Sequence, residues 1–318
     1  MTRVVRMILA TALAILNATA WSQSYPSKTI RLITSEPGGA GDFSARIMAQ
    51  GLSAGLGSTV VENRGGTGVI AAELVAKSPP DGHTLLSYGS NIWLIPFLED
   101  NVPYDPVRDF APVTLAMRSP CLIVVHPSLP VHSVRELVAL AKARPGELNY
   151  AAGGTGGTPH IAAELFKSMA GVNIVRIPYK GTGPAVNSLV GGHVQLMFPT
   201  ASSVTAHLRS GRLRALAVTT AQSSVLAPGL PTATASGLPG YEASSIQVLF
   251  TPAGTPSPII ARLNQEVARH LSLPETREKL LNSGVESVAS SPEVLSATIK
   301  SEMSRLGKLI KDTGMKGQ

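Results

Sequence analysis

Two glycine-rich segments carry the residues whose types and spacing could do chemistry. The first reads Pro37-Gly-Gly-Ala-Gly-Asp42 and the second Gly153-Gly-Thr-Gly-Gly-Thr-Pro159. Each follows an apolar, strand-like segment and precedes a helix-like one. Free N–H groups and the helix dipole attract anions to a helix N-terminus, and glycines let the backbone approach a ligand closely. The two segments therefore predict a pair of anion-binding loops.

The loops do not match the common nucleotide-binding motifs. Neither has the Gly-Lys-Ser/Thr that follows the glycines of a triphosphate-binding loop. Gly39-Ala-Gly41-Asp-Phe-Ser44 is a partial dinucleotide fingerprint, and Glu62 lies about 20 residues further on, where a ribose-binding acid would sit. A Rossmann-type NAD(P)-dependent oxidoreductase is therefore an alternative, although Ser44 replaces its third glycine. If the first loop does not bind a dinucleotide, Glu62 is expected to lie at an exposed strand end.

Single polar residues near the loops leave two roles open. Asp42 can cap the helix that follows it and pair with Arg46 one turn later, or it can contact a ligand. His160, in the first turn of the second helix, is either structural or in contact with the ligand. Trp93 packs in the core or stacks on an aromatic ligand.

Signatures of covalent catalysis and of metal binding are missing from the sequence. Ser44 and Ser87 lack the G-x-S-x-G context of a hydrolase nucleophile. The one cysteine, Cys121, stands in an apolar run and is expected to be a buried thiol. Cys/His spacings typical of metal sites are not present, so we expect no enzyme activity, cofactor or metal.

The elements that must position these residues alternate between strand and helix patterns, which predicts parallel sheets covered by helices on both faces. Strands are expected at residues 29–34, 59–62, 84–88, 122–125, 148–152, 172–177, 193–198, 213–219 and 245–251. Helices are expected at residues 43–56, 68–77, 134–144 and 159–170, from about 184 to 190, at residues 203–210, 258–271 and 274–282, and from 292 onward. Ser133-Val-Arg-Glu136 is a capping box. The apolar stripe Leu295, Ile299, Met303, Leu306 and Ile310 of the last helix predicts core packing.

Residues 1–22 predict a secretory signal peptide. Arg3 and Arg6 give a basic start, an apolar run follows at residues 7–16, and small residues offer cleavage near Ala20 or Ser22. A buried N-terminal helix or an anchor is the alternative. Removing both arginines lowers the formal charge from +7 to +5. The remaining basic residues are scattered and only 4% of residues are aromatic, which argues against nucleic-acid binding.

Long stretches of the chain together resemble the substrate-binding receptors of tripartite tricarboxylate transporters, the Bug family of periplasmic proteins. The similar stretches include "YPSKTIRLI", "PGGAGDFSAR", "VVENRGGTGVIAAELVAKSPPDGHTLL", "VPYDPVRDFAPVTL", "ELVALAKARPGELNYAAGGTGGTPHIAAELFKSMAGV", "IPYKGTGPAVNSLVGGHVQLMF" and "LFTPAGTPSPIIARLN". They run from about Tyr25 to the C-terminus in the family's order.

The resemblance implies a two-domain, type II periplasmic-binding-protein α/β fold with a ligand cleft between the domains. Residues 23–122 plus 246–318 would form domain 1, and residues 123–245 domain 2. In this family both loops grip a ligand carboxylate. The residues carried over are Pro37, Gly38, Gly39, Asp42, Ser87, Ser90, Asn91, Ala152, Gly153, Thr155, Thr158 and Lys180. For Lys180, a solvated turn position is an equal alternative.

The resemblance also implies a function. The chain would be a monomeric periplasmic receptor that delivers a small organic carboxylate to the permease subunits of a tripartite tricarboxylate-type transporter. A ligand-sensing partner of a membrane signalling protein is the alternative within the same fold. Two departures stand out: Glu36 beside the first loop would repel an anion, and Pro199 follows Phe198 where the family often has an acid. The second departure favours plain carboxylates over amino acids.

Overall fold

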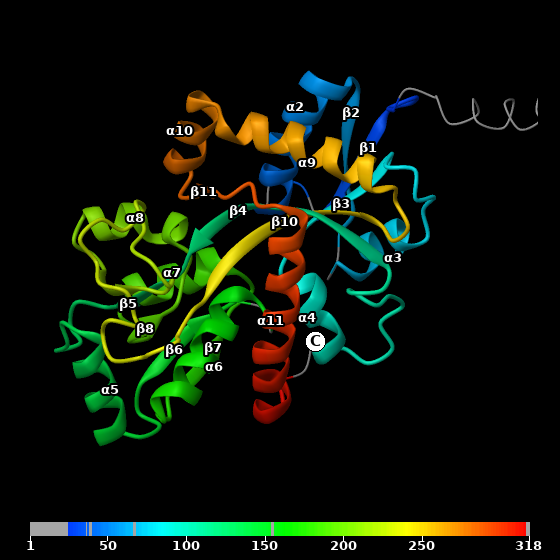
Figure 1. Ribbon diagram of the computed structural model, residues 1–318. Coiled ribbons are helices and arrows are strands. Elements are labelled where there is room, and N and C mark those ends of the chain that lie inside the picture. Colours follow the sequence, from blue (N-terminus) through cyan, green and yellow to red (C-terminus); the bar gives the residue numbers. More distant parts are fainter. Residues whose placement is uncertain (1–24, 36, 38–39, 66–67, 154–155, 316–318) are drawn as a thin grey trace, which may run out of the picture.

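The chain folds into two β-sheets that are each covered by helices (Figure 1). The computed structural model describes residues 25–315, apart from residues 36, 38–39, 66–67 and 154–155. The first sheet has the strand order β11-β4-β10-β3-β1-β2 and the second the order β7-β6-β8-β5-β9. This mixed architecture confirms the predicted α/β class.

The first sheet combines a parallel half with an antiparallel half. Its strands are β1 (Ile30–Thr34), β2 (Thr59–Asn63), β3 (Thr84–Gly89), β4 (Phe110–Pro120), β10 (Ser244–Pro252) and β11 (Glu286–Ser287). Strands β2, β1 and β3 are parallel neighbours, whereas β10 runs antiparallel to both β3 and β4. Its helices are α2 (Ala40–Leu56), α3 (Val69–Ala76), α4 (Asn91–Leu98), α9 (Ser257–Ser272), α10 (Pro274–Asn282) and α11 (Pro292–Thr313). Helices α2 and α4 begin at the carboxyl ends of the neighbouring strands β1 and β3.

The second sheet repeats this arrangement. Its strands are β5 (Leu122–Val125), β6 (Asn149–Ala152), β7 (Val175–Pro178), β8 (Leu196–Met197) and β9 (Arg214–Val218). Its helices are α5 (Val134–Ala143), α6 (Thr158–Ala170), α7 (Thr182–Val190) and α8 (Ala201–Arg209). Strand β6 is parallel to β7 and β8. Helices α6 and α7 therefore begin at the carboxyl ends of the neighbouring strands β6 and β7.

Two chain crossings connect the sheets, one from β4 to β5 and one leading into β10. Thr219 ties them together: its hydroxyl lies 2.8 Å from the carbonyl oxygen of Cys121 and 2.5 Å from that of Ala243. The Thr219 side chain is fully buried. Cys121 is buried as predicted. The crossings lie near the predicted domain boundaries, but the residue ranges of the domains stay a prediction.

Helix α11 packs against elements of both sheets. It contacts β4 and α4 on the side of the first sheet and α6 on the side of the second, and Figure 1 shows it beside α4 below the first sheet. Its apolar stripe is core as predicted, with Met303 only partly buried. Trp93 of α4 is fully buried, which confirms the core interpretation of this residue. Its indole Nε1 donates to Glu302 Oε2 of α11 at 3.1 Å.

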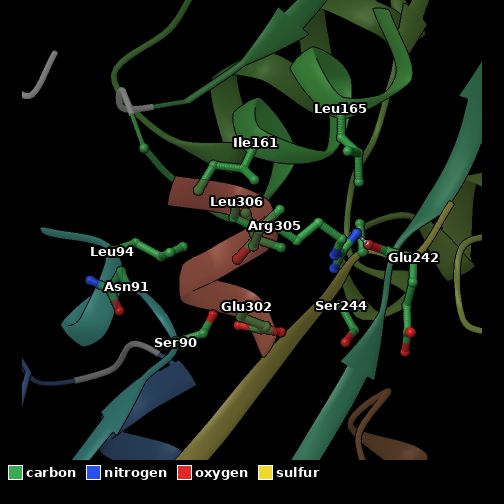
Figure 2. A pocket seen from close by; sticks show the side chains of 13 residues that line it. Ser90, Asn91, Leu94, Ile161, Leu165, Glu242, Ser244, Glu302, Arg305 and Leu306 are labelled. Carbon is green, nitrogen blue, oxygen red and sulfur yellow. Dashed lines mark hydrogen bonds between the residues drawn. The ribbon is translucent and has the colours of Figure 1, made fainter. Parts of the chain in front are cut away.

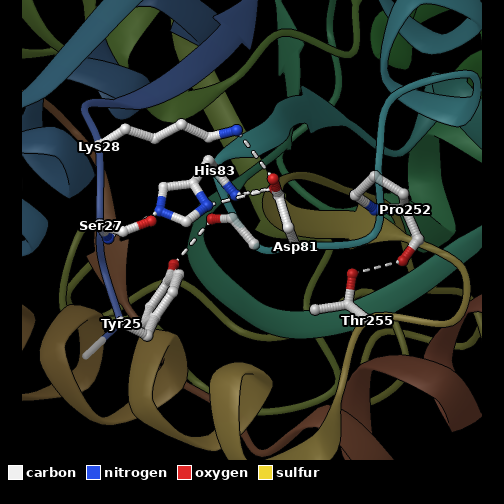
Figure 3. A network of polar contacts seen from close by, with 8 residues as sticks. Tyr25, Ser27, Lys28, Asp81, His83, Pro252 and Thr255 are labelled. Atoms are coloured by element: carbon white, nitrogen blue, oxygen red, sulfur yellow. Dashed lines mark hydrogen bonds and ion pairs between the residues drawn. The ribbon is translucent and has the colours of Figure 1, made fainter. Parts of the chain in front are cut away.

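The segment before β1 is fastened to the turn before β3 (Figure 3). Tyr25 donates its hydroxyl to the Gly82 carbonyl at 2.7 Å, and Lys28 pairs with Asp81 at 2.9 Å. The Ser27 amide donates to His83 Nε2 at 3.1 Å, while His83 Nδ1 faces the Asp81 carboxylate at 3.2 Å. Desolvation, strengthened by the Asp81 charge, raises the pKa of the Tyr25 phenol. These bonds fix the start of the first sheet.

Two kinds of element depart from the predictions. The strand expected at residues 193–198 pairs only at Leu196–Met197, because residues 191–195 form the turn that precedes it. Helix α4 and the long strand β4 were not among the predicted elements. The predicted capping box is half formed: Ser133 Oγ accepts from the Glu136 amide, but the Glu136 carboxylate bonds the His132 amide instead of that of Ser133.

Candidate ligand-binding site

Among the helices whose N-termini are described, α3, α4, α6, α7 and α8 follow strands and have no side-chain cap. Ser90 precedes α4, Gly157 precedes α6 and Gly181 precedes α7, and none of these residues caps its helix with a side-chain hydrogen bond. Helices α9 and α10 also lack such a cap. The N-termini of α4 and α6 differ from those of the other uncapped helices because both line one pocket. Their N–H groups can bind an anion there.

Gly156, in the second loop, packs against the C-terminal end of α4. A Cβ atom at this position would stand 2.5 Å from Leu98 Cδ1 of α4, and the φ angle is +75°. Only glycine tolerates both the close approach and this backbone conformation. The loop of the second sheet is therefore packed directly against a helix of the first.

His160 holds the same loop from inside the protein. The Gly156 amide donates to its Nδ1 at 3.1 Å, and the ring is 4% exposed. Desolvation, with the nearby Arg176 charge second, lowers the pKa of His160 to about 4. The ring therefore stays neutral and keeps an acceptor for the amide at neutral pH. These contacts support the structural role of His160.

A cation lies on the other side of the second loop. Arg176 Nη2 of β7 donates to the Gly153 carbonyl at 2.7 Å. A Cβ atom on Gly153 would lie 3.5 Å from Gly181 Cα, so this loop and the start of α7 are in contact. The arginine fixes the loop and adds positive charge close to the ends of two helices.

The described residues of the first loop also support its shape. Asp42 is 5% exposed, pairs with Arg46 at 3.0 Å and accepts from Asn63 Nδ2 at 2.8 Å. The pair with Arg46 was predicted. The helix begins at Ala40, however, so Asp42 lies within its first turn and does not precede it. Asn63 also donates to the Ser35 carbonyl at 2.7 Å, which ties β2 to the loop.

Glu62, the residue that a dinucleotide site would need, is occupied by other groups. Its carboxylate receives two hydrogen bonds from Arg31, at 2.6 and 2.9 Å, and one from Arg64 at 3.2 Å. The hydrogen bonds from Arg31 lower the pKa of Glu62. The side chain is partly buried, not exposed as predicted, because β2 continues to Asn63. This engagement weakens the oxidoreductase alternative.

One pocket lies where α4, α6 and α11 approach the crossing before β10 (Figure 2). The space in it that is wide enough for a water molecule is about 30 Å³. Its lining residues come from both sheets and from α11: Ser90, Asn91, Leu94, Gly156, Thr158, Ile161, Leu165, Glu242, Ala243, Ser244, Glu302, Arg305 and Leu306. The uncapped ends of α4 and α6 are thus parts of the same pocket wall.

The pocket wall includes the carboxyl group of Glu302, whose charged form is destabilised by burial. Burial raises the pKa of Glu302 to about 7, and the charge of Glu242 acts in the same direction. The hydrogen bond from Trp93 and the charges of Arg305 and Arg118 lower the pKa, but desolvation outweighs them. Near neutral pH, a large share of the Glu302 carboxyl groups is therefore protonated.

The predicted site residues divide into several groups. The pocket brings together Ser90, Asn91 and Thr158. Gly153 and Ala152 lie behind the second loop, with Ala152 fully buried at the end of β6 and its carbonyl accepting from the Tyr179 amide.

The remaining predicted residues lie elsewhere. Pro37 and Lys180 are exposed and do not line this pocket. Ser87 is fully buried in β3, and among the described residues its hydroxyl has no hydrogen-bond partner. Gly38, Gly39 and Thr155 lie outside the described residues, as does Glu36.

Sequence reasoning did not find the contribution of α11. Glu302, Arg305 and Leu306 line the pocket, although the helix was interpreted only as core. A local signal existed, because Glu302 and Arg305 flank the apolar stripe three residues apart on one side of the helix.

Two searches over the described part of the chain gave simple results. Every helix there is too short or too polar to be a membrane span. Among the same residues, no three His, Cys, Asp or Glu side chains gather as a metal ion would require.

Comparisons with known proteins agree with the resemblance. A family model described as "Tripartite tricarboxylate transporter family receptor" matches residues 44–315. Protein BugT of Bordetella pertussis (strain Tohama I) is 36% identical over 322 residues, covering 99% of this chain and 99% of that protein.

Two solved structures are similar in both sequence and fold. The structure "R. palustris Rpa4515 with adipate" shares 38% identity with a TM-score of 0.77, covering 91% of this chain and 98% of that chain. MatC (Rpa3494) from Rhodopseudomonas palustris with bound malate shares 30% identity with a TM-score of 0.74, covering 90% and 100%. The two-domain fold of periplasmic solute-binding proteins is thereby confirmed. The chain belongs to the tripartite tricarboxylate transporter receptor family.

Proposed function

We propose that this chain captures a small organic carboxylate between its two α/β domains and delivers it to the permease subunits of a tripartite tricarboxylate-type transporter. It does so in the periplasm, as a monomer, after removal of a signal peptide near Ala20 or Ser22. Domain 1 comprises residues 23–122 plus 246–318, and domain 2 residues 123–245. Adipate and malate, the ligands in the two related structures, are both carboxylates.

The observation that carries the proposal is the meeting of two uncapped helix ends at one pocket. The uncapped N–H groups at the starts of α4 and α6 favour the binding of an anion. Ser90, Asn91 and Thr158 add hydroxyl and amide donors beside them. Because one helix belongs to each sheet, a ligand held by both ends would favour the closed arrangement of the domains.

The first loop and the ends of β6 and β7 complete the proposed contacts. Backbone N–H groups of Gly38, Gly39 and Gly153–Thr155 would reach the carboxylate. Pro37 has no N–H and would contribute only to the wall. Asp42 positions the first loop through Arg46 and Asn63. Ser87, Ala152 and Lys180 remain proposed wall residues.

Thermal unfolding of the mature chain, residues 23–318, with a panel of carboxylates tests this proposal. A ligand at 100 times its dissociation constant stabilises the folded state by about 2.7 kcal/mol. We expect one class of carboxylate to raise the melting temperature and NAD(P) to leave it unchanged. A rise with NAD(P) alone would refute the receptor function in favour of the dehydrogenase.

A pair of variants locates the binding site. Thr158→Asp places a negative charge at the first residue of α6. There it stabilises the helix through the helix dipole, and it repels a carboxylate. Ser257→Asp makes the same change at the exposed first residue of α9. We expect the first variant to lose the carboxylate-dependent rise and the second to keep it. Equal responses of the two variants would contradict binding at α6.

A further inference from the structure

The positive charge of the mature chain comes from one part of the sequence. Residues 123–245 contain nine Lys and Arg, four Glu and no Asp, which gives a formal charge of +5. Residues 23–122 and 246–318 together contain 16 basic and 16 acidic residues, so their formal charge is zero. A charge difference of this size between two parts of one chain indicates a charged partner for the basic part.

The fold gathers basic side chains that are scattered in the sequence. Arg209 ends α8, Arg212 lies in the turn that follows, and Arg214 begins β9. Nη1 of Arg214 donates to two carbonyl oxygens within residues 129–131, at 3.1 and 3.4 Å. That segment leads into α5, whose first turn carries Arg135. We call these four arginines the basic face.

The charges of the basic face are accessible to a partner. Arg214 is partly buried, and the other three arginines are exposed. None of the ion pairs among the described residues includes any of the four. One acid, Glu136, stands beside Arg135, and its carboxylate accepts from the His132 amide at 2.6 Å. The basic face therefore keeps a net positive charge at the surface.

The basic face lies at the end of the second sheet that is remote from the second loop. Strand β9 is antiparallel to β5, β5 is antiparallel to β8, and β8 is parallel to β6. Strands β9 and β6 therefore run in the same direction. The basic face is at the start of β9, whereas the second loop follows the end of β6. In Figure 1, α5 and α8 lie on the left of the second sheet, and α4 and α11 lie on its right.

The character of the basic face favours lipid headgroups over a protein partner. Stable protein interfaces are built around buried aromatic or apolar anchors. The exposed large apolar side chains that the structure describes within residues 123–245 are Met169, Val175 and Val225, and none of them lies on α5, α8 or β9. An anionic membrane needs no such anchor, because its surface potential attracts basic side chains directly.

We propose that the basic face binds reversibly to an anionic phospholipid surface. The guanidinium groups lie at lipid phosphates, which accept the paired hydrogen bonds that arginine donates. The pocket at α4 and α6 stays clear of the lipid, because it lies on the other side of the second sheet. This inference goes beyond the proposed function: it holds the receptor at a membrane surface and does not depend on which carboxylate is bound.

Co-sedimentation of the mature chain, residues 23–318, with vesicles of stated composition tests the inference. One set of vesicles is phosphatidylcholine alone, and the other contains about 30% phosphatidylglycerol, which makes the surface anionic. We expect binding only to the anionic vesicles at about 0.02 M salt. At about 0.5 M salt the Debye length falls to about 4 Å, so the bound chain should be released.

Two triple variants of equal net charge locate the binding surface. The face variant combines Arg135→Gln, Arg209→Gln and Arg212→Gln. The control variant removes three exposed basic side chains from α10 and α11 by Arg277→Gln, Lys279→Gln and Lys300→Gln. Each basic side chain at an anionic surface increases the affinity about fivefold, so the face variant should bind about 100-fold more weakly. The control variant should weaken by less than about fivefold, because its charges lie away from the lipid.

The outcomes separate this inference from the proposed function. Circular dichroism and the carboxylate-dependent rise in melting temperature should match the wild type in both variants. A wild-type chain that does not bind anionic vesicles at low salt would overturn the inference and leave the basic face to an acidic protein partner. Equal weakening of both variants, or binding that persists at high salt, would overturn it as well. Each of these failures leaves carboxylate binding intact.

Discussion

Replacing Glu302 by glutamine should stabilise the protein above neutral pH and not below pH 4.5. The carboxyl group has an ordinary pKa of 4.5 and a pKa of about 7 in the folded chain. The unfolded chain thus releases this proton at a lower pH than the folded chain does. Stability from the protonated form is fully present below pH 4.5 and is lost as the pH rises to about 7.

The magnitude follows from the shift in pKa. A difference of one pKa unit corresponds to about 1.36 kcal/mol, so a rise from 4.5 to about 7 is equivalent to about 3 kcal/mol. Partial exposure to solvent reduces this value, and we expect about 1–3 kcal/mol at pH 8. Glutamine keeps an oxygen acceptor for the Trp93 indole and carries no charge, so the variant avoids this destabilisation.

Urea unfolding of wild-type and Glu302→Gln proteins at pH 5 and pH 8 measures the effect. The comparison between the two proteins removes the pH dependence of all other groups. Glu278→Gln on the exposed surface of α10 is the matched control and should follow the wild type at both values. A Glu302→Gln protein that is less stable than the wild type at pH 8 would refute the reasoning. So would a difference that is the same at both pH values.

Two further predictions concern the second loop. Gly156→Ala should lower the free energy of unfolding by about 1–3 kcal/mol because of its positive φ and its contact with Leu98. Urea unfolding measures this loss. A double variant with Leu98→Ala should recover part of it, because the smaller side chain relieves the contact. His160→Leu should cost about 1–3 kcal/mol by leaving the Gly156 amide without its acceptor. The same variant should lose less stability than the wild type between pH 6.5 and pH 4, because the wild-type imidazole resists protonation in the folded chain. An equal acid response of both proteins would contradict the role assigned to His160.

The local pattern of the sequence was enough to predict most of the two sheets and the second loop. Glycine-rich turns between strand-like and helix-like segments mark where parallel strands end, so the starts of α6 and α7 were found within one or two residues. The capping box at Ser133 located α5 in the same way. Such signals are local, because they depend on backbone groups and side chains a few residues apart.

Helix α4 gave no comparable signal because it is buried on most sides. Its sequence is almost entirely apolar, contains Pro96 and buries five of its residues. An amphipathic period arises only when one face of a helix meets water, so the pattern that identifies α6 is absent here. The N-terminus of α4 was predicted as part of the site only through the resemblance, which supplied Ser90 and Asn91.

The contribution of α11 depends on packing between distant parts of the chain. Glu302 and Trp93 are 209 residues apart in sequence and meet only because α11 packs against α4. The apolar stripe predicted that packing correctly but could not say which neighbours Glu302 and Arg305 would have. Charged residues beside a stripe are usually solvated, and only the fold distinguishes this pair from that common case.

Several departures from local stability rules lie around the same pocket. Two helix ends without side-chain caps, a glycine with positive φ against a leucine, a carboxyl group with a raised pKa and an arginine without an ion pair all lie there. Departures of this kind are expected where a ligand completes the structure. A bound carboxylate would supply acceptors to the free N–H groups of these helix ends. The residues whose conformations are least favourable without a ligand should therefore contribute most to the stabilisation that ligand binding provides.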